Sequence, residues 1–267
     1  MERARLGINT MTTRNWSLAQ EAEAYARHGI ANIGIWESMC GGRSGASVRG
    51  LMAAHGLRVS HVCYGGGFTA ASAEERARAI EQTRRLIAFT AEAGSDCLLI
   101  VAGPIGAHGR AGALGYVRDG IERVLPEAQA HRVRLGLEPI HPMEITQWSV
   151  ITTVPDALEL VDAIGSPGLG VFLDTYHIFW DPRVLSHIAR CAGRIAGVHL
   201  ADWRSPTRSF TDRTVPGRGV VPFGELIAAF EAAGYRGSYD VELFSDELWA
   251  SDYEALLTEI CAWADAV

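Results

Sequence analysis

Short apolar runs alternate with longer amphipathic stretches along the whole chain, and the pattern returns roughly every 33 residues. The run Leu98-Leu99-Ile100-Val101 has the continuous apolar character of a strand buried on both faces. Alternation of strand and helix patterns indicates a parallel sheet. The apolar runs predict eight strands, at Arg5–Asn9, Asn32–Trp36, Arg58–Cys63, Cys97–Ala102, Arg134–Glu138, Gly170–Asp174, Ile195–Leu200 and Tyr239–Leu243.

The amphipathic stretches carry recognisable helix ends. Ser72 is a predicted N-cap, and Glu75 stands at the third helical position of a possible capping box. The predicted helices stop before glycine, which is the common way for a chain to leave a helix and turn into the next strand. The clearest of them span Ser17 to His28, Ser72 to Ala93, Pro155 to Ile164 and Pro222 to Ala233.

Eight strand–helix units without a left-over segment predict a single (β/α)8 TIM barrel over residues 1–267. The length agrees, because such a barrel needs about 250 residues. The alternative is an open, doubly wound sheet. It is weakened by the absence of a GxGxxG motif after the first strand.

Composition narrows the class of protein. Hydrophobic residues make up 48% and charged residues 21%, and the net charge of −7 is spread along the chain, which argues against a nucleic-acid partner. The five cysteines form no CxxC, so a reducing compartment is expected and the cysteines are interpreted as small buried residues. The start, MERARLGINT, lacks the apolar run of a signal peptide, and no window is apolar enough for a membrane span. A cytoplasmic protein is expected.

Four consecutive predicted strands end in a group that can bind a metal ion: Glu138, Asp174, His199 and Glu242. Reactive groups of a parallel barrel collect at the carboxyl ends of its strands. One such residue alone is more often a helix cap or a surface charge, but charges inside buried runs need a partner or a metal ion. The set predicts a divalent-metal site, with Mn²⁺ or Mg²⁺ favoured by the oxygen ligands and Co²⁺ or Zn²⁺ as alternatives.

Three further histidines follow strands. His141 comes three residues after Glu138, and His177 comes three residues after Asp174, so both are expected to face a substrate at the barrel mouth. His61, at the end of the third strand, is expected to line the same pocket. The competing interpretations are loop histidines bonded to the backbone and, for His61, a core histidine with satisfied hydrogen bonds.

The longest irregular stretch runs from Trp203 to Pro222, and loops of this length in compact domains usually serve function. Arg204 is expected to clamp an anionic or hydroxyl-rich substrate, whereas Arg208 and Arg213 are compatible with solvated side chains. Tryptophans are expected to form an apolar wall at the mouth, unless they only fill the core; they are Trp36, Trp148, Trp180 and Trp203.

At these residues the chain resembles the xylose-isomerase-like TIM-barrel superfamily, and within it the sugar phosphate isomerase/epimerase group. The resemblance covers essentially the whole chain and implies that the four predicted ligands bind Mn²⁺, Mg²⁺ or Co²⁺. It also implies that the two glutamates form the acid/base pair, that His177 and an arginine of the loop after the seventh strand hold the substrate, and that the protein forms a homo-oligomer.

A narrower similarity is to a subgroup that includes the catalytic subunits of C-glycoside deglycosidases, where a histidine after the strand-five glutamate is a proposed base. The motifs that carry it are Glu138-Pro-Ile-His141-Pro-Met, Asp174-Thr-Tyr-His177-Ile-Phe-Trp180-Asp-Pro, His199-Leu-Ala-Asp202-Trp203, Asp212-Arg213, Pro216-Gly217-Arg218-Gly219 and Val241-Glu242-Leu243-Phe244-Ser245.

The leading hypothesis is a metal-dependent isomerase or epimerase that acts on a keto sugar or a related hydroxycarbonyl compound through an enediolate. Glu138 and Glu242 would exchange the proton, with His141 in reserve as the base. The alternative is a lyase that cleaves 3-oxo-glycosides by β-elimination, with His141 as base and a small second subunit. A metal nuclease is disfavoured by the negative charge, and a non-catalytic sugar-binding barrel has little use for an acid/base pair.

Overall fold

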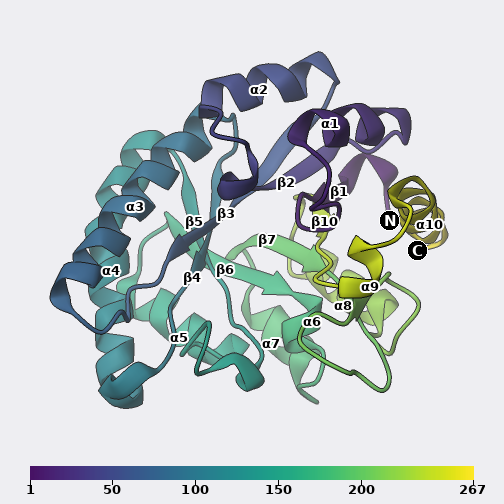
Figure 1. Cartoon of the computed structure of the whole chain (residues 1–267). Coiled ribbons are helices and arrows are strands. Elements are labelled where there is room, and N and C mark those ends of the chain that lie inside the picture. Colours follow the sequence, from purple (N-terminus) through teal and green to yellow (C-terminus); the bar gives the residue numbers. More distant parts are fainter.

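The computed structural model describes residues 1–267 and shows a closed barrel of eight parallel strands (Figure 1). Around the barrel the order is β1-β10-β7-β6-β5-β4-β3-β2. The predicted (β/α)8 barrel is therefore confirmed, and the open sheet was wrong. The barrel strands are β1 (Leu6–Asn9), β2 (Asn32–Trp36), β3 (Arg58–Gly66), β4 (Cys97–Val101), β5 (Arg134–Leu137), β6 (Leu169–Asp174), β7 (Ile195–Leu200) and β10 (Tyr239–Val241).

Helices surround the barrel (Figure 1). Ser72 caps α3, and the side chain of Glu75 bonds back to the Ser72 backbone, so the predicted capping box is present. Gly165 ends α5 in the left-handed region at a φ of 66°, a conformation that favours glycine. The helices are α1 (Leu18–Arg27), α2 (Gly45–Ala54), α3 (Ala73–Glu92), α4 (Gly109–His131), α5 (Val154–Ile164), α6 (Thr175–Ile178), α7 (Val184–Arg190), α8 (Phe223–Ala232), α9 (Asp246–Trp249) and α10 (Tyr253–Ala266).

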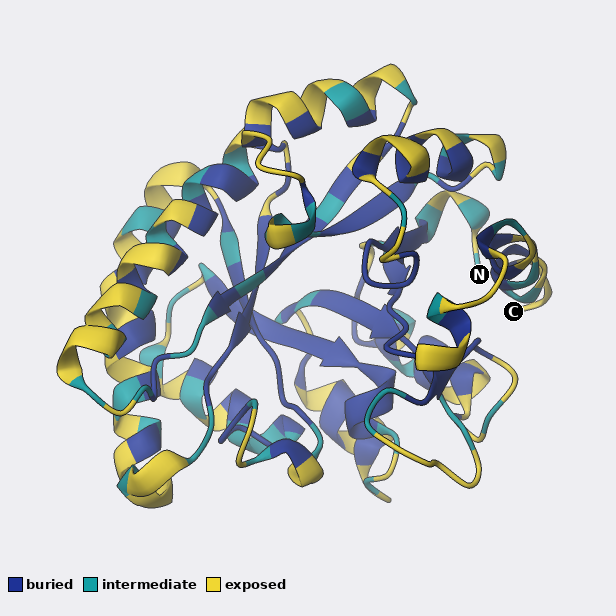
Figure 2. Ribbon diagram, in the orientation of Figure 1, coloured by how far each residue is buried: buried dark blue, intermediate teal, exposed yellow.

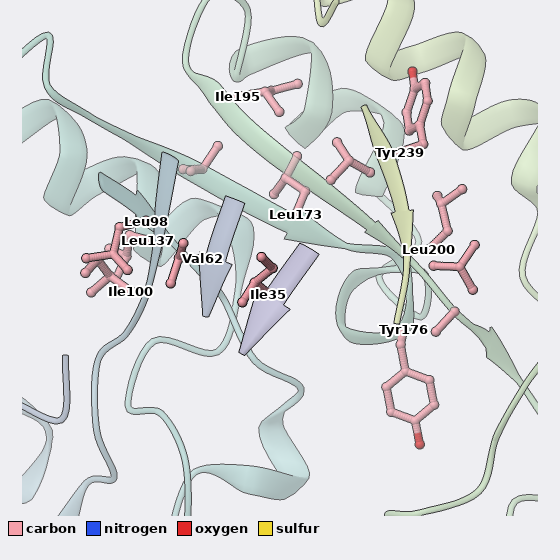
Figure 3. Close-up of a cluster of buried hydrophobic side chains, with 14 of the residues drawn as sticks. Ile35, Val62, Leu98, Ile100, Leu137, Leu173, Tyr176, Ile195, Leu200 and Tyr239 are labelled. Atoms are coloured by element: carbon pink, nitrogen blue, oxygen red, sulfur yellow. The ribbon is translucent and has the colours of Figure 1, made fainter. Parts of the chain in front are cut away.

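The core has an outer and an inner part. A cluster of 69 buried residues fills the space between strands and helices, and Figures 2 and 3 show this buried layer. A cluster of 6 buried residues lies apart from it. On β4, Leu98 and Ile100 belong to the large cluster and Leu99 and Val101 to the small one, as the twofold period of a strand requires. Each fully buried aliphatic side chain stabilises the fold by about 1.5–3 kcal/mol.

The same alternation brings polar residues into the barrel. Leu137, Leu173, Val198 and Val241 all belong to the outer cluster, and each immediately precedes one of the four predicted ligands. Since neighbouring residues of a strand point to opposite faces, the ligands face the barrel interior. The backbone N–H of Glu138 donates to Ile100 and that of Glu242 to Leu200, so the strand ladder continues through both glutamates.

The stretch predicted to be irregular contains a small antiparallel ribbon of β8 (Asp202–Trp203) and β9 (Arg213–Thr214). Its anchor is Asp202, whose carboxylate accepts backbone N–H bonds from Trp203 at 2.8 Å, Gly217 at 2.9 Å, Gly219 at 2.7 Å and Val221 at 2.9 Å. A buried carboxylate with four backbone donors is well satisfied. The loop is therefore held in one shape above β7.

The five cysteines are buried and free, as expected. None of the helices combines the length and the apolar character that crossing a membrane requires. The two chain ends lie near each other beside α10 (Figure 1).

Candidate metal and substrate site

The four predicted ligands converge inside the barrel. Glu138, Asp174 and His199 each offer one ligand atom, and these atoms lie within 4.8 Å of one another. Glu242 joins them through His199, since its Oε2 is 3.4 Å from His199 Nδ1. All four side chains are buried. Short local contacts help to orient them, such as the bond from the Tyr176 N–H to Asp174 Oδ1 at 2.9 Å.

The donor set fits a divalent cation. His199 Nδ1 is a buried nitrogen that makes no hydrogen bond, although it faces the carboxylates. An unpartnered buried nitrogen costs free energy unless it binds something. Three carboxylates and one imidazole suit Mn²⁺, Mg²⁺, Co²⁺ or Zn²⁺.

The charges in the site also favour a bound divalent cation. Burial raises the pKa of Glu138 well above its usual range, with further repulsion from Asp174 and Glu242. Burial also raises the pKa of Asp174, against the attraction of Arg213, and it raises the pKa of Glu242 to about 7. One guanidinium faces three carboxylates, which leaves two negative charges uncompensated when all three are ionised. A divalent cation would balance them.

Arg213 supplies that guanidinium, which corrects the expectation of a solvated side chain. It is 2% exposed, and its Nη1 donates to Asp174 Oδ2 at 2.7 Å and to the Glu242 carbonyl at 3.2 Å. Its Nη2 lies 3.3 Å from His177 Nε2. The guanidinium packs between the rings of Tyr176 and Phe244, at 4.5 and 4.8 Å from their centroids. Burial among carboxylates makes it part of the site.

Arg204 was expected to clamp the substrate, and the structure places it elsewhere. Its Nε lies 3.0 Å from Asp212 Oδ1 and its Nη2 3.3 Å from Glu247 Oε2. Arg208 binds the same two carboxylates. Asp212 immediately precedes β9 and pairs with these two arginines, whereas Arg213, the first residue of β9, pairs with Asp174 inside the barrel. The arginine that reaches the site is thus Arg213.

Aromatic rings surround the cavity above the ligands. Trp36, Tyr64, Trp148, Phe210 and Phe244 contact one another in a closed circuit, with centroid separations of 5.2 to 6.3 Å. We call these five residues the aromatic collar. They line one cavity together with Glu138, Glu242, His177 and Arg213. Trp36 also donates from Nε1 to Glu242 Oε1 at 2.9 Å, so it joins the collar to the predicted ligands.

Trp180 and Trp203, the other two tryptophans that were expected to form a wall at the mouth, lie next to His141. The ring of His141 is 5.5 Å from Trp180 and 5.3 Å from Trp203, and its Nδ1 accepts the Met143 N–H at 3.2 Å. Desolvation lowers the pKa of the half-buried His141, which favours a neutral imidazole. Because Nδ1 accepts, the proton of the neutral ring is on Nε2, and this N–H can donate to a substrate.

His177 and His61 differ in where they lie. His177 lines the collar cavity beside Arg213, as expected for a substrate contact. His61 does not line that cavity; it lies against His199, with their Nε2 atoms 2.7 Å apart, and faces a cavity at the opposite end of the barrel. Burial lowers the pKa of all three imidazoles, so they are neutral. The pocket role predicted for His61 is therefore not supported.

Comparison with known sequences decides the family. The profile described as xylose isomerase-like TIM barrel matches residues 5–266, which is nearly the entire chain. The chain belongs to this family. The resemblance inferred from the motifs is thereby confirmed at the level of the xylose isomerase-like barrels, while the narrower subgroup stays a prediction.

Curated relatives of this xylose isomerase-like barrel include sugar epimerases. An L-ribulose-5-phosphate 3-epimerase UlaE of Shigella flexneri serotype 5b is 27% identical over 56% of this chain and 49% of its own. A D-psicose 3-epimerase of Enterocloster bolteae is 29% identical over 51% and 40%. A 3-dehydroshikimate dehydratase of Pseudomonas aeruginosa is 25% identical over 90% and 38%. The matches therefore span half or less of the length of these relatives.

Solved structures share the architecture. Protein SMc04130 of Sinorhizobium meliloti 1021 is 34% identical, with a TM-score of 0.93 over 97% of this chain and 96% of its own. The IOLI protein with a bound zinc atom is 17% identical, with a TM-score of 0.84 over 97% and 95%. The second likeness concerns the fold alone.

Proposed function

We propose that the protein is a divalent-metal-dependent isomerase or epimerase of a keto sugar or a related hydroxycarbonyl compound. The observation that carries this proposal is the convergence of three buried carboxylates, a neutral imidazole and one guanidinium at the bottom of an aromatic cavity. Buried acids with raised pKa values are typical of groups that move protons. The sugar epimerases among the relatives support the same class of substrate.

Glu138, Asp174, His199 and Glu242 would hold the cation, and Mn²⁺ is the expected ion. When bound, such an ion supplies a Lewis acid that polarises a carbonyl oxygen. The aromatic collar limits the entry of water, which strengthens every electrostatic interaction in the cavity. Trp36 keeps Glu242 in one orientation through its Nε1–H, which fixes the direction from which this carboxylate can reach a substrate carbon.

The proton transfer is assigned to the two glutamates. One takes the proton from the carbon beside the carbonyl, and the other returns it to the neighbouring carbon or to the opposite face. Arg213 and His177 lie side by side in the cavity wall and can donate to the substrate oxygen on which negative charge develops. His141 is the reserve base, and its ring stands at the edge of the site between Trp180 and Trp203. Because Nδ1 accepts the Met143 N–H, the proton of the neutral ring is on Nε2, so His141 can accept a substrate proton only once this contact breaks.

The test follows carbon-bound protons. Each ketose of a panel is incubated in D₂O with protein loaded with Mn²⁺, and exchange of the proton beside the carbonyl is followed by NMR. Exchange and product formation are expected with the loaded protein and are lost on treatment with a chelator. Glu242→Gln is expected to lower turnover by at least about 100-fold, since general acid–base groups contribute that much.

A matched control is Glu159→Gln, which changes an exposed glutamate of α5 outside the site. It should leave turnover unchanged. Exchange of the carbon-bound proton at the full rate by chelator-treated, metal-free protein would contradict the proposed mechanism. Unchanged turnover of the Glu242→Gln variant would remove Glu242 from the acid/base pair.

A lyase acting on 3-oxo-glycosides is the second candidate. It is favoured by His141 between Trp180 and Trp203 and by the aromatic collar, whose five residues line the cavity in which a planar aglycone could lie. A dehydratase among the relatives also supports elimination chemistry in this family. Release of an aromatic aglycone from a 3-oxo-glycoside, lost in His141→Gln but not dependent on ketose turnover, would favour the lyase.

A further inference from the structure

A column of polar side chains runs through the barrel beneath the predicted ligands. His61 Nε2 lies 2.7 Å from His199 Nε2, and His61 Nδ1 lies 3.1 Å from Ser60 Oγ. Ser60 Oγ lies 2.8 Å from Asp240 Oδ1, and Ser238 Oγ donates to the other oxygen at 2.8 Å. Three members of the column, Asp240, His61 and His199, are 1 to 2% exposed. A polar chain through a closed barrel needs a reason, because buried polar groups are costly when they lose a partner.

Two glycines leave the space that this column occupies. A Cβ at Gly34 would lie 2.4 Å from His61 Cε1, and a Cβ at Gly7 would lie 2.1 Å from Asp240 Oδ1. Both glycines stand inside strands, where glycine weakens the strand unless something packs closely against the backbone. Gly7 of β1 thus leaves room for Asp240, and Gly34 of β2 leaves room for His61.

The hydrogen bonds of the column run in one direction. Both oxygens of Asp240 accept from a hydroxyl group, Oδ1 from Ser60 and Oδ2 from Ser238, so the single hydroxyl proton of Ser60 points to Asp240 and not to His61. Ser60 Oγ then accepts from His61 Nδ1–H. A neutral imidazole with a proton on Nδ1 has its lone pair on Nε2, so His61 accepts from His199 Nε2–H. The lone pair of His199 is consequently on Nδ1, the atom that faces Glu242.

The opposite direction has a cost at both ends. It would take the Ser60 proton away from Asp240 Oδ1, and it would put a proton on His199 Nδ1, the nitrogen that a cation needs free. His199 Nδ1 makes no hydrogen bond although Glu242 Oε2 is 3.4 Å away, which agrees with a lone pair on that atom. Asn9 does not select a direction, since its Nδ2 is 3.4 Å from His61 Nε2 and 3.5 Å from His199 Nε2.

We propose that His61 is a positioning residue that, anchored by Ser60 and Asp240, holds His199 with its proton on Nε2 and its Nδ1 free for the cation. This inference rests on the proposed metal centre and adds to it the residues that prepare the only imidazole ligand. Partners behind a metal-binding histidine fix its tautomer and ring orientation, and their loss lowers metal affinity by about 10- to 100-fold.

The experiment measures Mn²⁺ affinity of metal-free protein by electron paramagnetic resonance of the free ion. His61→Leu removes the acceptor, and its affinity is expected to fall about 10- to 100-fold. His61→Gln returns an acceptor oxygen and should recover most of the loss. His187→Leu is the matched control, because His187 is also a buried imidazole, lies on α7 outside the column, and its loss should leave Mn²⁺ affinity unchanged.

A second readout needs no variant that might misfold. In metal-free wild-type protein with ¹⁵N-labelled histidine, NMR should show His199 with the proton on Nε2. A proton on Nδ1, or a folded His61→Leu variant that binds Mn²⁺ like the wild type, would overturn the positioning role. If the wild type itself bound no Mn²⁺, the proposed metal centre would fail and the positioning role with it.

Discussion

At the scale of single residues, Arg213 and Arg204 stand nine positions apart in one loop and have opposite surroundings. Arg213 lies among the buried carboxylates, whereas Arg204 pairs with Asp212 and Glu247 outside the cavity. Arg213→Met is therefore expected to lower kcat/KM of the Mn²⁺-loaded enzyme by about 10²–10³-fold, as the loss of a donor to developing charge does. Arg213→Lys should recover only part of the lost kcat/KM, because an ammonium group cannot contact Asp174 and His177 at the same time as a planar guanidinium does.

The control for this prediction is Arg204→Met, measured with the same substrate. It removes the same functional group from the same loop, so kcat/KM should stay within a few-fold of the wild type. A larger loss in Arg204→Met than in Arg213→Met would restore the original assignment of the substrate clamp to Arg204. The signal that could have identified Arg213 is its place in the Asp212-Arg213 motif; its burial depends on charges distant in sequence.

Glu21 gives a pH-dependent prediction at the same scale. It is buried on α1, and its Oε1 accepts from Thr13 Oγ1 at 2.7 Å. Burial raises its pKa well above the usual 4.5. A raised carboxyl pKa means that the folded protein keeps a proton that the unfolded chain releases above about pH 4.5. The contribution of protonated Glu21 to the free energy of unfolding is complete below that pH. It is lost as the pH rises, by up to about 1.4 kcal/mol for each pH unit.

Glu21→Gln removes this dependence, so its gain in free energy of unfolding over the wild type should grow between pH 5 and pH 8. Urea denaturation at the two pH values measures the difference. Glu23→Gln changes an exposed glutamate of the same helix. Its free energy of unfolding should differ from that of the wild type by the same small amount at both pH values. A gain for Glu21→Gln that did not change with pH would show that Glu21 titrates alike in the folded and unfolded chain.

At the scale of elements, the β8–β9 ribbon depends on Asp202. Its two oxygens accept four backbone N–H bonds from a loop that also carries Phe210 and Arg213. Asp202→Asn leaves one accepting oxygen and turns an NH₂ group towards the remaining donors. The free energy of unfolding should fall by about 1–3 kcal/mol, since buried donors lose their partner. Limited proteolysis should cut between residues 203 and 221 before it cuts the barrel.

The comparison variant is Asp119→Asn, which changes an exposed aspartate of α4 in an i,i+4 ion pair. Its unfolding free energy should stay within about 0.5 kcal/mol of the wild type. An Asp202→Asn protein that resists protease as well as the wild type would mean that the ribbon is held by other contacts. Loss of turnover without loss of stability would point to a direct role of Asp202 in the reaction.

Local patterns predicted most of the barrel because its strands and helices are defined by neighbours in sequence. β2 and β7 begin and end where their apolar runs do, and α3 begins at the predicted cap. β3 is longer than predicted, since Gly65 and Gly66 pair with β4 beyond an irregular register. The β8–β9 ribbon had no local signal, because the donors that hold Asp202 include residues 15 to 19 positions later.

At the scale of the whole molecule, the closed barrel explains why four groups distant in sequence could be predicted to meet. Inward positions of neighbouring parallel strands share one end of the barrel, so a polar residue at each strand end points to a common centre. The contents of that centre were less predictable. The placement of His61 behind His199, and not at the substrate, follows from the bulge between β2 and β3 and from the space at Gly34.

The charge balance of the centre gives a prediction for the stability of the whole protein. Mn²⁺ binds the folded state, so at about 100 times Kd it adds about 2.7 kcal/mol, which raises Tm by about 5–10 °C for a chain of this size. Glu242→Gln removes one of three buried carboxylates. The variant should therefore melt higher than the wild type without metal at pH 8, because repulsion decreases, and gain less from Mn²⁺, because a ligand is lost.

These two effects have opposite signs in one variant, which separates a metal centre from a structural cluster. Glu21→Gln also removes a buried carboxylate, but outside the barrel, so it should shift Tm equally with and without Mn²⁺. Calorimetry of the three proteins in chelator and in Mn²⁺ gives all six values. A Glu242→Gln protein with the full Mn²⁺-induced rise would place the ion away from Glu242. A lower Tm of that variant in chelator would mean that Arg213 alone already neutralises the carboxylates.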